Sequence, residues 1–138
     1  MKTKAIHNIK AAGALIDKAE EGYYTASIHH VYYAVFQYMK YELAHTDMEP
    51  LSDEEQTVKA KEDRVGSHDF IIKEIKRRIG RLANLDTAKD FARDVRELKG
   101  DRIDADYRSR QFTLEESLAC KRLAEELITK LKTYFGDL

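Results

Sequence analysis

The chain has 138 residues, 43% of them hydrophobic, and a formal net charge of -1, which excludes an intrinsically disordered protein and favours a single domain over residues 1–138. Its only cysteine excludes an internal disulfide and a cysteine-rich metal site, and no apolar run reaches the roughly 18 residues of a membrane span. We therefore expect a cytoplasmic protein without membrane contact, and the single proline leaves most of the chain free to be helical.

Two helices are predicted in the first third of the chain. Between residues 4 and 20 the apolar positions recur every three or four residues, and Gly22 is expected to end this helix. The segment 24–44 is the most apolar of the chain, which predicts the central helix of the fold. Within it, His29 and Tyr33 lie four residues apart at the edge of the apolar stripe. We expect both to face one groove, whereas His30 points away.

An acidic segment follows at 46–66, with seven acidic residues against three basic ones and the only proline. This segment is longer than a plain connection in a compact domain, so it is either mobile or contains a short helix. Ser52 and Glu55 have the spacing of a capping box, which would begin such a helix. We interpret the segment as a solvated lobe of the domain.

Three more helices are predicted in the second half. Ser67 is a plausible N-cap for the first, and the second follows Thr87 and continues past Gly100. Thr113 and Glu116 form a second capping box, which opens the last helix. The predicted fold class is all-α: an antiparallel up-and-down bundle of four long helices plus a short one.

The helix after Ser67 carries cations opposite its isoleucine stripe. These residues are Lys73, Lys76, Arg77, Arg78 and Arg81. Such a face can follow a nucleic-acid backbone, or it can be an ordinary solvated helix face, since a total charge near zero argues against general polyanion binding. No aromatic residues are interleaved to stack on bases, and both interpretations stay open.

The next helix places Arg102 where its apolar stripe requires a core residue. Burying a guanidinium without a partner costs several kcal/mol, so we expect it to be paired, or to face a groove or an interface. Asp106 lies one turn further on the same side and is the expected partner. An ordinary structural ion pair would explain both residues equally well.

Two motifs resemble one known family, the HEPN domain. They are Tyr32-Tyr33-Ala34-x-Phe36 and Arg102-x-x-Ala105-Asp106-Tyr107, with His68 at the start of an intervening helix. The resemblance covers nearly the whole chain, and the second motif is similar to the branch with an Arg-x-x-Ala-Asp-Tyr signature.

The resemblance implies a helical bundle that forms a homodimer, often in prokaryotic toxin-antitoxin or defence pairs with a minimal nucleotidyltransferase. Many HEPN proteins are metal-independent ribonucleases in which an arginine holds the phosphate and a histidine a few residues later transfers protons. No histidine follows Arg102 in this chain, and Asp106 or Tyr107 occupies its place. An aspartate there would repel RNA phosphate, and a tyrosine is a poor base at neutral pH.

These observations lead to three functional hypotheses. The first is a catalytically degenerate HEPN interaction protein with a nucleotidyltransferase partner, and in this hypothesis the partner transfers AMP to Tyr107. The second is a ribonuclease toxin that acts on RNA through Arg102, with His68 or Tyr107 as the proton-transfer group. The third is a helical scaffold with no nucleic-acid role.

The residues of the candidate groove are Arg102, Asp106, Tyr107, His68, Tyr33 and His29. We expect no metal, because the aspartates around Arg102 match no calcium loop. The chain has no glycine-rich phosphate loop, so no cofactor is expected either.

Overall fold

The computed structural model describes residues 1–136, and within them all regular secondary structure is α-helical. The predicted all-α helical bundle is confirmed, and five of its helices have at least 16 residues, one more than the four long helices expected. The six helices are α1 (Lys2–Asp17), α2 (Glu21–His45), α3 (Asp53–Glu62), α4 (Ser67–Leu82), α5 (Leu85–Tyr107) and α6 (Leu114–Phe135).

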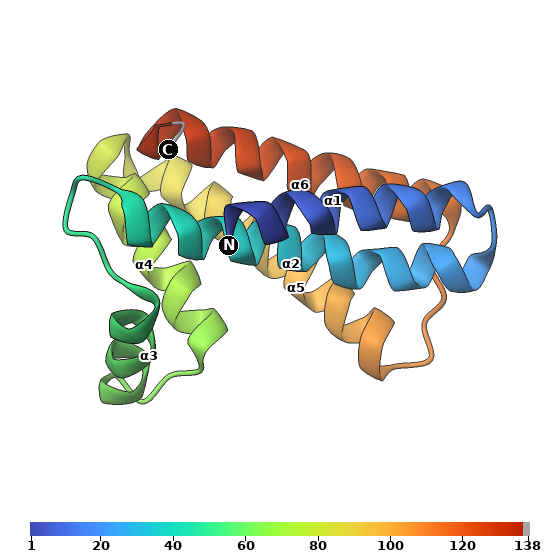
Figure 1. Ribbon diagram of the computed structural model, residues 1–138, viewed down its shortest axis with the longest axis horizontal. Helices are drawn as coiled ribbons and strands as arrows, with labels where there is room; N and C mark the ends of the chain where they lie inside the picture. The colour runs from blue at the N-terminus through green and yellow to red at the C-terminus, as the bar shows by residue number, and fades with distance from the viewer. Residues whose placement is uncertain (137–138) are drawn as a thin grey trace.

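Helix α2 is the centre of the bundle and contacts α1, α4, α5 and α6. In Figure 1, α1 and α2 run in opposite directions, as do α4 and α5, and then α5 and α6. Buried side chains lie on more than one side of α2, which explains why this most apolar segment takes the central place. None of the helices in residues 1–136 is long and apolar enough to cross a membrane.

The connection between α1 and α2 differs from the prediction. Helix α1 ends at Asp17, and Gly22 lies in the first turn of α2 instead of ending α1. The chain reverses at Lys18–Glu20, where Ala19 has a positive φ of 55°. A left-handed residue at the end of a helix is usually glycine or asparagine, so the sequence pointed to Gly22 and missed Ala19.

The acidic segment contains the short helix α3, which begins with the predicted capping box. The Ser52 hydroxyl accepts a hydrogen bond from the Glu55 backbone N–H, and the Glu55 side chain accepts one from the Ser52 N–H. Leu51, Gln56 and Ala60 are buried, so the inner face of the segment packs on the bundle while its acidic residues face solvent. Figure 1 shows α3 projecting from the bundle beside α4.

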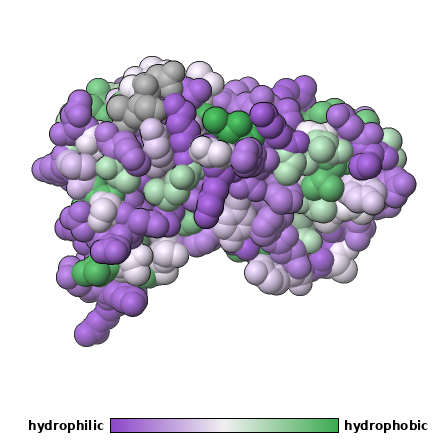
Figure 2. All heavy atoms as spheres, in the orientation of Figure 1, coloured by the Kyte–Doolittle hydropathy of each residue, from purple (hydrophilic) through white to green (hydrophobic). Residues whose placement is uncertain are grey.

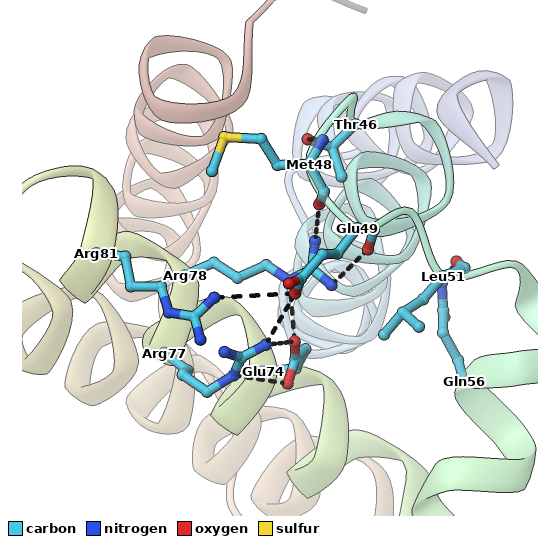
Figure 3. A network of polar contacts seen from close by, with 9 residues as sticks. All are labelled: Thr46, Met48, Glu49, Leu51, Gln56, Glu74, Arg77, Arg78 and Arg81. Atoms are coloured by element: carbon cyan, nitrogen blue, oxygen red, sulfur yellow. Dashed lines mark hydrogen bonds and ion pairs between the residues drawn. The ribbon is translucent and has the colours of Figure 1, made fainter.

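Helix α4 holds this segment through Arg78, which the sequence analysis had placed on the solvated basic face. Arg78 is instead buried, and it donates hydrogen bonds to the backbone oxygens of Met48 (2.6 Å) and Glu49 (2.7 Å). It also donates to the carboxylate of Glu74 at 2.9 Å, as Figure 3 shows. The prediction for Arg78 is therefore wrong, because the loop after α2 covers the edge of α4 and supplies carbonyl acceptors.

The other helix starts lie close to their predicted places. Helix α4 begins at Ser67 itself, so Gly66 and not Ser67 is the N-cap. Helix α5 begins after Asn84, whose side chain accepts a hydrogen bond from the Thr87 backbone N–H at 2.8 Å. The capping box of Thr113 and Glu116 opens α6 as predicted.

Candidate functional site

Arg102 lies in the last third of α5, which continues past Gly100 as expected. Its side chain is only 9% exposed, and its Nη1 lies 3.6 Å from Oδ2 of Asp106, so the predicted ion pair is present. A distance of 3.6 Å exceeds hydrogen-bond length, and the Asp106 carboxylate keeps some contact with solvent. The pair therefore neutralises the guanidinium without fixing it by hydrogen bonds.

Three tyrosine rings enclose the guanidinium of Arg102. Its Cζ lies 5.3 Å from the ring centre of Tyr32, 5.4 Å from that of Tyr33 and 5.8 Å from that of Tyr107. Within residues 1–136 its Nε is buried and has no hydrogen-bond partner. Contacts between the cation and aromatic faces thus compensate part of its lost hydration. Tyr33 and Tyr107 are among the predicted groove residues, whereas Tyr32 is not.

His29 binds the same carboxylate from α2. Its Nδ1 lies 2.8 Å from Oδ2 of Asp106, and its ring lies 4.7 Å from that of Tyr33. His30 points to α1, where its Nδ1 is 2.8 Å from the side-chain oxygen of Asn8, as its predicted opposite direction requires. Burial, together with the neighbouring His29, lowers the pKa of His30.

His68 enters the site from the first turn of α4. Its Nδ1 is 2.7 Å from the hydroxyl of Tyr32, and its ring is stacked 4.0 Å from that of Phe36. Burial and then the nearby charge of Arg102 lower the pKa of His68 to about 4, while burial raises the pKa of Tyr32 far above its ordinary range. Both groups are therefore neutral near pH 7, and Tyr32 connects His68 to Arg102.

An ion pair between α4 and α5 borders the site. Nζ of Lys99 lies 3.0 Å from Oδ1 of Asp69, and this hydrogen bond lowers the pKa of Asp69. Neither residue could be predicted from the sequence, because they are 30 positions apart and each is one of several charged residues in its own helix. Tyr32 could have been found, since it precedes Phe36 by one turn on the buried stripe of α2.

The structure brings together every residue of the predicted groove, and Tyr32 completes the set. We call this set the Arg102 cluster; its members are His29, Tyr32, Tyr33, His68, Arg102, Asp106 and Tyr107. They come from α2, α4 and α5, and Figure 2 shows the surface hollowed between the part over α3 and α4 and the part over the end of α5. The basic residues of α4 other than Arg78 form a separate surface, described below.

Two members of the Arg102 cluster, His68 and Asp106, are already engaged by other members. His68 is neutral and its Nδ1 is engaged by Tyr32. The carboxylate of Asp106 contacts both Arg102 and His29. Its negative charge opposes the approach of a phosphate to Arg102. Tyr107 is the most accessible member, with 75% of its surface exposed.

No group of three or more histidine, cysteine, aspartate or glutamate side chains in residues 1–136 is arranged to hold a metal ion. Among family models, that of the HEPN domain matches residues 1–134. No curated protein and no solved structure matches the chain significantly.

Proposed function

The chain belongs to the HEPN domain family, and from this premise we propose that it is an interaction protein whose own ribonuclease centre is degenerate. The family includes ribonucleases of toxin and defence systems, and its domains often dimerise. In the proposed function the protein is a homodimer and pairs with a minimal nucleotidyltransferase in a prokaryotic toxin-antitoxin or defence system. It acts in the cytoplasm.

The single observation that carries this proposal is the state of Arg102. In a ribonuclease of this type the arginine must be free to hold a phosphate, and a histidine near it must exchange protons. Here Asp106 pairs with the guanidinium and three tyrosine rings enclose it. The one imidazole joined to Arg102 through Tyr32 belongs to His68, whose low pKa makes it a poor proton donor at neutral pH.

The exposed side of the Arg102 cluster supports the proposed dimer. Tyr107 is largely exposed, and His29 and Tyr33 are half-buried beside it. Aromatic residues are enriched in the centres of protein interfaces because they bury a large area with little loss of conformational freedom. A second copy that covers these rings would also seal Arg102 from solvent.

Tyr107 is also the proposed site of modification by the nucleotidyltransferase partner. Its phenol oxygen would attack the α-phosphorus of ATP, forming a phosphodiester to AMP while the bond to the β-phosphate breaks and pyrophosphate leaves. The phenol proton passes to solvent or to a base of the partner enzyme. The exposure of Tyr107 makes its hydroxyl accessible to a second protein.

Two measurements test the proposed partners. Light scattering after size-exclusion chromatography should give a dimer, and Tyr107→Asp should shift it toward monomer, whereas Tyr23→Asp, at another exposed tyrosine, should not. Incubation with ATP and a minimal nucleotidyltransferase should add one AMP group, and Tyr107→Phe should abolish the addition. A wild-type monomer, or a protein that stays unmodified, contradicts the corresponding part of the proposal.

A second candidate function is a metal-independent ribonuclease. The hydrogen bond between His68 and Tyr32, together with the contact between Arg102 and the Tyr32 ring, favours it, because one tyrosine then contacts both an imidazole and a guanidinium. RNA cleavage that disappears in His68→Gln would assign His68 as the proton-transfer group, and loss only in Tyr107→Phe would assign Tyr107. Intact RNA in both the wild type and the variants supports the interaction protein.

A further inference from the structure

A hollow of about 420 Å³ lies where α4 meets the start of α5, away from the Arg102 cluster. Its lining residues are Lys73, Lys76, Arg77, Gly80, Arg81 and Leu85. Four of the six carry positive charge and none carries negative charge, so the rim of the hollow is basic throughout. We call this surface the α4 hollow.

Gly80 creates the depression at the middle of the α4 hollow. It occupies the helix face between Arg77 and Arg81, and a Cβ built there would make only an ordinary contact, 3.8 Å from the Cβ of Ala88. Leu85 forms the wall on the side of α5 and is 59% exposed. The α4 hollow therefore offers an apolar seat for one side chain, surrounded by cations.

The two arginines of the rim, Arg77 and Arg81, both reach toward Glu49, as Figure 3 shows. Glu74 holds Arg77 through two hydrogen bonds, to Nε and Nη2. Glu49 lies 3.9 Å from Arg77 and 3.8 Å from Arg81, distances too long for hydrogen bonds, as Figure 3 shows. Arg81 can thus accept a carboxylate from another molecule without losing a hydrogen bond to Glu49, whereas Arg77 is already held by Glu74.

We propose that the α4 hollow binds an acidic segment of a partner protein that inserts one apolar side chain beside Gly80. Carboxylates match the cationic rim, and a leucine-sized anchor covers Leu85 and fills the space that Gly80 leaves. The phosphates of a nucleic acid would pair with the cations, but its bases would find no aromatic ring in the lining on which to stack. This proposal is independent of the dimer and of the Arg102 cluster.

The test uses the purified full chain and three fluorescent probes of equal length. The first is a 12-residue peptide of glutamates and aspartates with two central leucines, the second has serines in place of the leucines, and the third is a single-stranded RNA. Fluorescence anisotropy should show the leucine peptide binding about tenfold or more tightly than the serine peptide, which reflects burial of one anchor. The affinity should fall as salt is added.

Two variants separate the anchor from the charge. In Gly80→Leu the new side chain occupies the apolar part of the α4 hollow, and every cation is kept. This variant should therefore reduce binding of the leucine peptide to the level of the serine peptide. Lys76→Glu should weaken both peptides, whereas the same charge reversal at the exposed Lys4 on α1 should not. Circular dichroism and thermal unfolding check that each variant is folded.

Several results would overturn the proposal. Equal affinity for the two peptides, or unchanged binding in a folded Gly80→Leu variant, excludes the apolar seat. Tighter binding of RNA than of the leucine peptide assigns the surface to nucleic acid instead. Because the assay contains no nucleotidyltransferase and Arg102 is intact in every variant, none of these results bears on the proposed function.

Discussion

Replacing Arg78 with alanine removes the side chain that ties the loop after α2 to α4. The variant loses hydrogen bonds from a buried guanidinium to one carboxylate and two backbone oxygens. Removing one partner of a buried ion pair costs about 3–5 kcal/mol. Met48 and Glu49 are exposed residues, so water can reach their freed carbonyls, and Glu74 keeps its bond to Arg77. We therefore expect a loss at the lower end, about 3 kcal/mol in the free energy of unfolding.

Urea denaturation followed by circular dichroism measures this loss, and the thermal midpoint should fall by roughly 10 °C. Arg81→Ala is the matched control, because Arg81 is on the same helix but is exposed and 3.8 Å from its nearest carboxylate. The control should lose no more than about 0.5 kcal/mol. A loss below about 1 kcal/mol for Arg78→Ala, or equal losses for the two arginines, would refute the reasoning about burial.

Two further predictions concern His68 and Glu49. The folded-state pKa of His68, about 4, lies below its ordinary value of 6.5, so the unfolded chain binds more protons between these pH values. The free energy of unfolding therefore falls as the pH decreases from 6.5 toward 4. We expect a loss of about 1–2 kcal/mol, because the half-exposed ring is partly screened by solvent. Urea titrations at pH 7 and 4.5 should show this difference between wild type and His68→Gln, and parallel losses in both proteins would contradict it. Glu49 has a positive φ of 52°, so Glu49→Gly should raise the free energy of unfolding by up to about 1 kcal/mol. Glu97→Gly, within α5, should lower it by about 1 kcal/mol, and equal effects at the two sites would show that φ is not the cause.

The sequence predicts best what is local along one helix. The capping boxes at Ser52 and Thr113 depend on residues three positions apart, and the pair of Arg102 with Asp106 depends on residues one turn apart. All three are present, because helix geometry alone brings such residues together. The contact between the rings of His29 and Tyr33, four residues apart on α2, has the same cause.

Contacts between segments that are distant in the chain could not be predicted from the sequence. Arg78 carries the same charge as the neighbouring cations of α4. No residue near it in the sequence indicates that the carbonyls of Met48 and Glu49 lie against it. The hydrogen bond between Tyr32 and His68 joins residues 36 positions apart, so the contact of Tyr32 with both His68 and Arg102 arises only from packing. Helix periodicity shows which side of a helix is buried, but not which neighbour covers it.

The central claim is that the Arg102 cluster does not cleave RNA, and incubation of the purified protein with RNA tests it most directly. The assay compares wild type with Arg102→Ala and with Arg93→Ala, whose arginine is exposed on the same helix. We expect the RNA to remain intact with all three proteins. Cleavage by wild type and by Arg93→Ala that is absent with Arg102→Ala would contradict the account.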